Sequence, residues 1–262
     1  MTLLKGQVAI VTGGGRGLGR AVAEALAALG ASVVVASRNA PELDDVVKSI
    51  RRAKGHALAQ TADVSDDRQV QELALATERW VGPATILVNN AGMVDPVAPL
   101  ARSDPALWLR NVGVNIGGTY LPMRALVPGM IERGFGRIVN ISSSSATRPS
   151  AGLTAYSASK AGVVHLTRSL ALELEGTGVT AVAYNPGHMD TEMQARLRRH
   201  STADFPRADE YRQLESEGKL IDPKRAARVV AYLTLPDTRR NGQALSSDDE
   251  DLAAAVDEAL PA

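Results

Sequence analysis

Tyr156 and Lys160 are the residues of this chain whose types and spacing point most directly to chemistry. Residues four apart lie on one face of a helix, so both side chains can reach the same pocket. A phenol with the ordinary pKa of about 10 must have its anion stabilised by about 4 kcal/mol to exchange protons near neutral pH. A lysine ammonium one turn away supplies part of that stabilisation. The pair indicates proton transfer at a substrate oxygen, unless it is only a half-buried tyrosine beside a solvated lysine.

A run of serines, Ser142 to Ser145, lies upstream of the predicted helix 156–175. It follows the apolar segment 137–141, which predicts a buried strand. The carboxyl end of a parallel strand is the edge at which open sheets bind ligands. A serine hydroxyl there could hold the oxygen that Tyr156 protonates or deprotonates.

The composition excludes several classes of partner. Lys+Arg and Asp+Glu both total 29 in 262 residues, so the formal net charge of zero gives no basis for nucleic-acid or anionic-membrane binding. The absence of cysteine excludes disulfides and thiolate metal sites and fits a reducing compartment. Residues 1–6 carry no long apolar segment, and the longest weakly polar run, 25–37, is broken by Gly30. We expect a soluble, cytoplasmic protein without a metal site.

A glycine-rich loop near the start of the chain predicts a phosphate site. The apolar run 7–12 predicts a buried strand, and 20–29 has apolar residues at helical spacing up to Gly30. Between them lies GGGRGLG, whose small residues let the backbone approach a pyrophosphate at the N-terminus of the helix. Its glycines form a GxxxGxG pattern in place of the usual GxGxxG. The alternative is a glycine-rich turn that binds nothing.

The next predicted strand, 32–36, ends at Ser37 and Arg38. In doubly wound folds an acidic side chain near this position binds the ribose 2′-hydroxyl of NAD(H), whereas arginine accommodates the 2′-phosphate of NADP(H). Here Ser37 occupies the place of the acid, and Arg16 in the glycine loop adds a second cation. The pattern favours NADP(H) over NAD(H), unless both arginines are solvated surface charges.

The remaining segments alternate between strand and helix patterns with no repeat or linker, so one domain spanning 1–262 suffices. We expect an α/β fold: a single-domain Rossmann-type, doubly wound parallel sheet with helices on both faces. The further predicted strands are 56–62, 85–88, 137–141, 179–184 and 242–245. The further predicted helices are 41–54, 67–80, 105–133, 156–175, 223–233 and 248–260.

Polar residues follow several of these strands. Asp63 could meet an adenine amino group or simply cap a turn. Asn89-Asn90-Ala91-Gly92 allows the backbone to pass close to a ligand. Asn115 lies inside the predicted helix 105–133, where asparagine is a poor helix former. It indicates either a kink with a water-binding carbonyl or only a polar face. The polar, arginine-rich segment 192–222 is interpreted either as a mobile lid over the substrate or as a solvated pair of helices.

Together these motifs resemble the classical short-chain dehydrogenases/reductases over nearly the whole chain. No motif is decisive by itself, but their joint presence in the family's order is specific. The matching elements are Thr12-Gly13, Gly17, Gly19, Asp63, Asn89-Asn90-Ala91-Gly92, Asn115, Ser143, Tyr156, Lys160, Pro186-Gly187 and Thr191. The resemblance implies hydride transfer by a nicotinamide cofactor that the protein orients.

The resemblance also implies the catalytic roles. The family's serine precedes its tyrosine by thirteen positions, which selects Ser143 from the run of four. Tyr156 would be the general acid/base. Lys160 would bind the nicotinamide ribose and lower the pKa of the tyrosine, helped by the charge of an oxidised nicotinamide. Asn115 would hold a water in the proton relay.

The cofactor contacts follow from the same resemblance. Asp63 would contact adenine, Asn90 would lie against the ribose, and Thr191 with the backbone after Gly187 would hold the carboxamide. The full set of expected cofactor-binding residues is Gly13, Gly15, Arg16, Gly17, Leu18, Gly19, Ser37, Arg38, Asp63, Val64, Asn90, Ala91, Gly92, Tyr156, Lys160, Pro186, Gly187, Met189 and Thr191.

Two departures from the family bear on assembly and substrate. The family usually has a glycine pair after its last strand, whereas here a variable tail, 246–262, begins with SSDDE. That segment commonly helps to form a tetramer interface, so we expect a homo-oligomer but leave dimer and tetramer open. His188 and Met189 stand where the family more often has small or β-branched residues, which would alter the floor of the substrate pocket.

We therefore expect an NADP(H)-dependent oxidoreductase that interconverts a carbonyl and a secondary alcohol on a small-molecule substrate. The alternatives are a non-catalytic NADP(H)-sensing regulator, an NAD-dependent alcohol dehydrogenase of the same fold, and an epimerase or dehydratase of the wider superfamily. The presence of both Tyr156 and Lys160 argues against a regulator. The GxxxGxG loop argues against the epimerases, which usually have GxxGxxG. The sequence does not specify the substrate.

Overall fold

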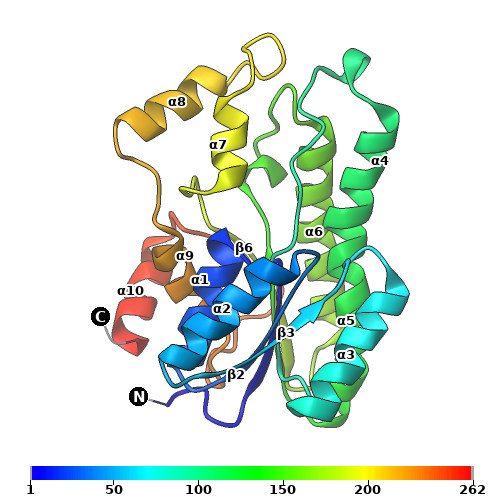
Figure 1. The fold of residues 1–262 in the computed structure, drawn as a ribbon, viewed down its shortest axis with the longest axis vertical. Helices are drawn as coiled ribbons and strands as arrows, with labels where there is room; N and C mark the ends of the chain where they lie inside the picture. The colour runs from blue at the N-terminus through cyan, green and yellow to red at the C-terminus, as the bar shows by residue number, and fades with distance from the viewer. Residues whose placement is uncertain (1, 261–262) are drawn as a thin grey trace.

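A computed structural model describes residues 2–260 and consists of one parallel sheet between two layers of helices (Figure 1). The seven strands follow the order β3-β2-β1-β4-β5-β6-β7. They are β1 (Val8–Thr12), β2 (Ser32–Ser37), β3 (His56–Thr61), β4 (Ile86–Asn89), β5 (Gly136–Ile141), β6 (Val179–Asn185) and β7 (Ala244–Ser246). The predicted doubly wound, Rossmann-type parallel sheet is confirmed, and every predicted strand is present.

Strand side chains alternate between two hydrophobic cores, as the two-residue period of a strand requires. Val33 and Val35 of β2 pack under α1, α2, α9 and α10, and Val34 packs on the opposite face with α3, α5 and α6 (left and right in Figure 1). The helices are α1 (Gly17–Ala28), α2 (Ala40–Arg52), α3 (Asp67–Trp80), α4 (Pro105–Val112), α5 (Gly118–Glu132), α6 (Thr154–Glu173), α7 (Glu192–Arg198), α8 (Ala208–Ser216), α9 (Pro223–Leu233) and α10 (Glu250–Ala259).

The chain fills the sheet outward from β1 in both directions. β2 and β3 extend it one way, and the chain then returns to place β4 on the other side of β1. Connections leave β1 and β4 in opposite directions, so the carboxyl ends of these two strands frame a crevice. Figure 1 shows α7 and α8 above this edge of the sheet.

The long helix predicted over 105–133 is interrupted. It consists of α4, a π-helical segment at Gly113–Gly117, and α5. Asn115 lies in the middle of the π-helical segment, so the irregularity expected at this asparagine is present. Wide turns of this kind occur mostly as single insertions inside α-helices, frequently at functional sites.

The acidic tail folds back onto the sheet. β7 pairs with β6, and α10 packs on α9 through the buried side chains of Leu252 and Val256. The tail that departs from the family is thus part of the hydrophobic core on this face. No helix within residues 2–260 is long and apolar enough to cross a membrane.

Arg137 of β5 is 5% exposed and joins separate segments of the chain. Its guanidinium donates hydrogen bonds to the carbonyl oxygens of Gly178, Leu235 and Pro236. Removing it takes this donor away from the oxygens of Gly178 and Pro236. We predict that Arg137→Met lowers the free energy of unfolding by about 3 kcal/mol in urea titrations. The exposed-site control, Arg124→Met, should change it by less than about 0.5 kcal/mol; equal losses in the two variants would contradict the argument.

Candidate active site

A cavity of about 1570 Å³ opens at the carboxyl edge of the sheet, between the ends of β1 and β4. It exceeds the usual size of a site for one drug-sized ligand, which leaves room for a dinucleotide together with a substrate. Every site residue predicted from the sequence lines this cavity except Gly19 and Asn115. Across the described part of the chain, no group of three or more His, Asp or Glu side chains could hold a metal ion.

The glycine loop packs tightly between α1 and the end of β4. A Cβ atom at Gly13 would lie 2.8 Å from the side-chain nitrogen of Asn90. A Cβ atom at Gly19 would lie 2.2 Å from the carbonyl oxygen of Gly13. Both positions therefore require glycine for packing. Gly19 supports the loop from beneath, which explains why it does not face the cavity.

The first turn of α1 is open toward the cavity. The helix begins at Gly17, and no side chain caps its N-terminus. Gly17 and Leu18 both line the cavity. The unpaired N–H groups and the positive end of the helix dipole are therefore available to a phosphate, as the sequence motif predicted.

Arginines and carboxylates surround the far end of the cavity. Arg16 Nη1 lies 4.0 Å from Glu42 Oε1, and Arg38 Nη1 lies 3.8 Å from an oxygen of Asp63. Both arginine side chains are more than half exposed, so these long ion pairs contribute little and leave most guanidinium N–H groups free. Glu42 also lines the cavity and was missed by the sequence analysis. Its position in the first turn of the helix that follows Ser37 could have indicated from the sequence that Glu42 lies near the cavity.

Asp63 caps the turn after β3. Its Oδ1 accepts hydrogen bonds from the N–H and the hydroxyl of Ser65, at 3.0 and 2.6 Å. Partial burial raises the pKa of the Asp63 carboxyl, but these hydrogen bonds and the charge of Arg38 outweigh burial and hold the pKa below its usual value. The predicted turn cap is confirmed, and the contact with adenine stays a prediction.

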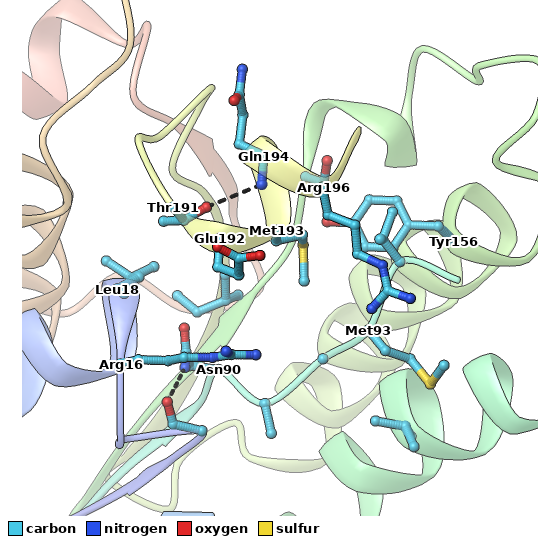
Figure 2. A pocket seen from close by; sticks show the side chains of 18 of the residues that line it. Arg16, Leu18, Asn90, Met93, Tyr156, Thr191, Glu192, Met193, Gln194 and Arg196 are labelled. Atoms are coloured by element: carbon cyan, nitrogen blue, oxygen red, sulfur yellow. Dashed lines mark hydrogen bonds between the residues drawn. The ribbon is translucent and has the colours of Figure 1, made fainter. Parts of the chain in front are cut away.

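The segment after β6 brings the other end of the chain to the glycine loop. Pro186, Gly187, Met189 and Thr191 all line the cavity. The Thr191 hydroxyl accepts a hydrogen bond from the Gln194 N–H and caps α7 (Figure 2). Figure 2 also places Thr191 beside Leu18 at the start of α1, so this segment and the glycine loop form adjoining walls.

The residues of the predicted proton-transfer centre converge on the cavity. Tyr156 and Lys160 reach it from α6, and Ser143 reaches it from the end of β5. Lys160 Nζ lies 5.7 Å from the centroid of the Tyr156 ring and donates a 2.7 Å hydrogen bond to the Ile141 carbonyl. Figure 2 shows Tyr156 on the opposite side of the cavity from Arg16.

In the protein without a ligand, burial is the largest cause of the shifted pKa values of the Tyr156 phenol and the Lys160 ammonium. It raises the pKa of Tyr156 to about 12 against the opposing effect of the Ser143 hydroxyl. It lowers the pKa of Lys160 to about 8. At neutral pH the phenol is protonated and the ammonium is mostly charged. The expected lowering of the tyrosine pKa by Lys160 is therefore not achieved by the chain alone, because burial opposes the phenolate.

Asn115 lies behind the cavity and braces the segment after β4. Its side chain accepts from the Met93 N–H and donates to the Met93 carbonyl, both at 2.9 Å. Asn111, which the sequence analysis missed, donates to the same carbonyl and accepts from the Ser159 hydroxyl at 3.0 Å. These hydrogen bonds fix the segment after β4, which forms a wall of the cavity, to α6. Asn111 and Asn115 are four residues apart and so share one helix face, which could have indicated from the sequence that they act together.

The polar segment 192–222 packs on one wall of the cavity. Its base is closed because the Ile221 N–H donates to the His188 carbonyl at 2.8 Å and the Asp190 N–H donates to the Ile221 carbonyl at 3.0 Å. It buries apolar side chains in one cluster with the wall of the cavity: Leu197, Phe205, Ala208 and Tyr211 with Val94, Val97 and Leu153. The segment is therefore anchored to the cavity wall by apolar contacts, and its role as a mobile lid stays a prediction.

Polar contacts also tie this segment to the rest of the protein. Arg196 Nη1 of α7 lies 3.1 Å from Asp95 Oδ2 in the segment after β4, and both residues line the cavity. The Arg207 guanidinium donates to the Ser150 hydroxyl at 3.0 Å. Arg196 and Tyr156 both line the cavity, and both are labelled in Figure 2.

The buried ammonium of Lys160 makes stability depend on pH. Lysine in an unfolded chain has a pKa of about 10.4, whereas burial lowers that of Lys160 to about 8. Between these values the unfolded state binds more protons, so the free energy of unfolding rises with pH by up to about 1.4 kcal/mol per unit. We predict this rise in urea titrations between about pH 8 and about pH 9.5, and its loss in Lys160→Met. The surface control Lys48→Met should retain it; an undiminished rise in Lys160→Met would refute the assignment.

Comparison with known proteins identifies the family. The sequence model of the family described as short chain dehydrogenase matches residues 7–202. The chain is 35% identical over 235 residues to the 3-oxoacyl-[acyl-carrier-protein] reductase of Synechocystis sp., covering 89% of this chain and 95% of that protein. It is 37% identical over 227 residues to the cis-4-hydroxycyclohexanecarboxylate dehydrogenase of Sinomonas cyclohexanicum, covering 87% of this chain and 88% of that protein.

Solved structures agree. Levodione reductase superposes with a TM-score of 0.86 at 29% identity, covering 96% of this chain and 99% of that one. A variant of actinorhodin polyketide ketoreductase with NADPH superposes with a TM-score of 0.84 at 35% identity, covering 92% and 95%. The chain therefore belongs to the short-chain dehydrogenase/reductase family, oxidoreductases that interconvert alcohol and carbonyl groups on small molecules.

Proposed function

We propose that this protein is an NADP(H)-dependent oxidoreductase that interconverts a carbonyl and a secondary alcohol, with Tyr156 as the acid/base. The observation that carries the proposal is that Tyr156, Ser143 and Lys160 line one continuous cavity with the glycine loop. One end thus has the groups that move a proton, and the other has the groups that bind phosphate.

The cavity fits the cofactor that this reaction needs. Gly13 and Gly19 leave no room for a side chain in the loop, and the first turn of α1 offers free N–H groups. Asp63 and Asn90 would hold the adenosine and ribose, and Thr191 the carboxamide. When bound, NADP(H) supplies or accepts the hydride.

The protein's own residues handle the proton. Because the pKa of Tyr156 is raised to about 12, its phenol is protonated and can donate to the oxygen of a carbonyl being reduced. The Ser143 hydroxyl can hold the same oxygen. The Lys160 ammonium favours the phenolate that remains. The Asn115 carbonyl accepts from the Thr119 hydroxyl at 2.8 Å, and its second lone pair could hold the relay water.

We predict that Tyr156→Phe lowers kcat by about a thousandfold or more, because the variant keeps the ring and loses the transferable proton. Its affinity for NADPH, measured by fluorescence titration, should stay within about twofold. Turnover is followed as loss of NADPH absorbance with ketones, quinones, diketones and β-keto esters. Tyr120→Phe, at an exposed tyrosine of α5, is the matched control and should retain full activity. Unchanged turnover in Tyr156→Phe would sink the mechanism. Tight NADPH binding without turnover in the wild type would favour a regulator.

The choice of NADP(H) rests on Arg16, Arg38 and Ser37 at the far end of the cavity. The two guanidinium groups can bind a 2′-phosphate with charge-assisted hydrogen bonds. Glu42 is the observation that favours the alternative, an NAD(H)-dependent enzyme, because its carboxylate could accept from an unphosphorylated ribose. The arginines carry more donors than Glu42 offers acceptors, so we favour NADP(H).

We predict that Arg38→Ala raises the Kd for NADPH by about tenfold and changes the Kd for NADH by less than about twofold. Calorimetric titration of both cofactors measures the two values. Arg20→Ala, on α1 outside the cavity, is the matched control and should change neither. If Arg38→Ala leaves NADPH binding intact while Glu42→Gln weakens NADH, the enzyme uses NAD(H) instead.

A further inference from the structure

The wall beside Tyr156 carries two polar side chains that the proposed reaction does not use. Tyr211 of α8 and His188, which follows β6, line the same cavity as Tyr156. Tyr211 is only 6% exposed and belongs to the buried cluster on which Tyr156 packs. Burial is the main cause of the raised pKa of Tyr156, and Tyr211 is close enough to add to it. Both side chains are therefore within the part of the cavity where the substrate reacts.

The ring of Tyr211 is held on several sides. The rings of His188 and Phe205 meet it edge-on, with centroids at 4.9 and 5.0 Å. The Arg207 guanidinium lies 5.6 Å from its centroid. The main-chain carbonyl of Tyr211 accepts from the Gln194 side chain at 3.4 Å. The phenol thus has a fixed position before any ligand arrives, which lowers the entropy cost of binding.

The hydroxyl at the end of this fixed ring is unpaired. No residue within 2–260 donates to it or accepts from it. The hydroxyl oxygen is not sealed from solvent, so water or a ligand oxygen in the cavity can pair with it. The Tyr184 hydroxyl is also unpaired, but it is sealed in the core, where no substrate reaches it. Tyr211 differs because it lines the cavity.

His188 complements this hydroxyl. Burial lowers the pKa of its imidazole, with a further lowering from the charge of Arg207 and opposing effects from Glu210 and Asp248. A neutral imidazole offers one donor and one acceptor. Arg207, the cation beside the pair, is bound to Glu210 and Ser150. The pair therefore suits an uncharged oxygen better than a carboxylate.

We propose that Tyr211 and His188 form a second oxygen-binding subsite, which selects substrates that carry an uncharged carbonyl or hydroxyl oxygen in addition to the reacting carbonyl. The inference rests on the proposed reductase function, whose site it extends. Diketones and hydroxyketones meet this description, and simple monoketones do not.

The test compares 2,2-dimethylcyclohexane-1,3-dione, which has no hydrogen between its two carbonyls and cannot form the conjugated enol, with 2,2-dimethylcyclohexanone. Tyr211→Phe keeps the ring packing and removes only the hydroxyl. It should lower kcat/KM for the diketone by about tenfold and leave that for the monoketone within about twofold. His188→Phe, which retains a ring edge against Tyr211, should give the same selective loss. Tyr232→Phe, on α9 outside the cavity, should change neither value. Equal effects on both ketones, or none, would overturn the subsite.

Calorimetric binding of the same two ketones separates the subsite from the reaction, because with NADP⁺ present no hydride can be transferred. The wild type should bind the diketone more tightly, and Tyr211→Phe should lose about tenfold for the diketone alone. If this selectivity appears although the wild type reduces neither ketone, the subsite holds and the proposed reduction fails for these substrates. If the wild type reduces both ketones without selectivity in binding, the reductase stands and the subsite is wrong.

Discussion

The hydrogen bonds between Thr12 and Asn90 are the constraint on which the whole site depends. The Thr12 hydroxyl accepts from the main-chain N–H groups of Asn90 and Ala91, at 3.0 and 3.1 Å. In return the Asn90 amide donates to the carbonyls of Thr12 and Gly13, at 2.9 and 3.2 Å. These bonds join the carboxyl ends of β1 and β4, where the direction of winding reverses. They hold the glycine loop on one side and the segment after β4 on the other, and so they fix the crevice between the strand ends, where open sheets of this kind bind ligands.

Burial is the second physical theme, because it sets the protonation states that the chemistry starts from. Tyr156 is half-buried and Lys160 is buried, and burial pushes each side chain toward its neutral form. At neutral pH the phenol of Tyr156 is therefore protonated. A cation bound beside it in the cavity would lower its pKa.

The two sides of the cavity are built from different parts of the chain. The glycine loop and the strand ends lie at the edge of the central sheet. In contrast, α7 and α8 lie in an insertion between β6 and α9, whose two ends are joined by the hydrogen bonds of Ile221. Its buried cluster presents Tyr211 to the cavity, and its ion pair between Arg196 and Asp95 joins it to the segment after β4. The residues of α7 and α8 can therefore vary without altering the wall of the cavity that the sheet forms.

The sequence by itself determined the fold and the glycine loop, because strand period, helix spacing and glycine placement are local signals. Ser143 and the role of Asn115 were predicted only through the resemblance to a known family. Only the tertiary structure decided what each side chain touches. In the folded chain Asn115 binds the main chain of Met93, and Gly19 packs against the glycine loop outside the cavity. Glu42 and Tyr211 line the cavity. It also set the pKa of Tyr156, which depends on how deeply α6 is covered. Such contacts join residues far apart in the chain, and neither periodicity nor composition records them.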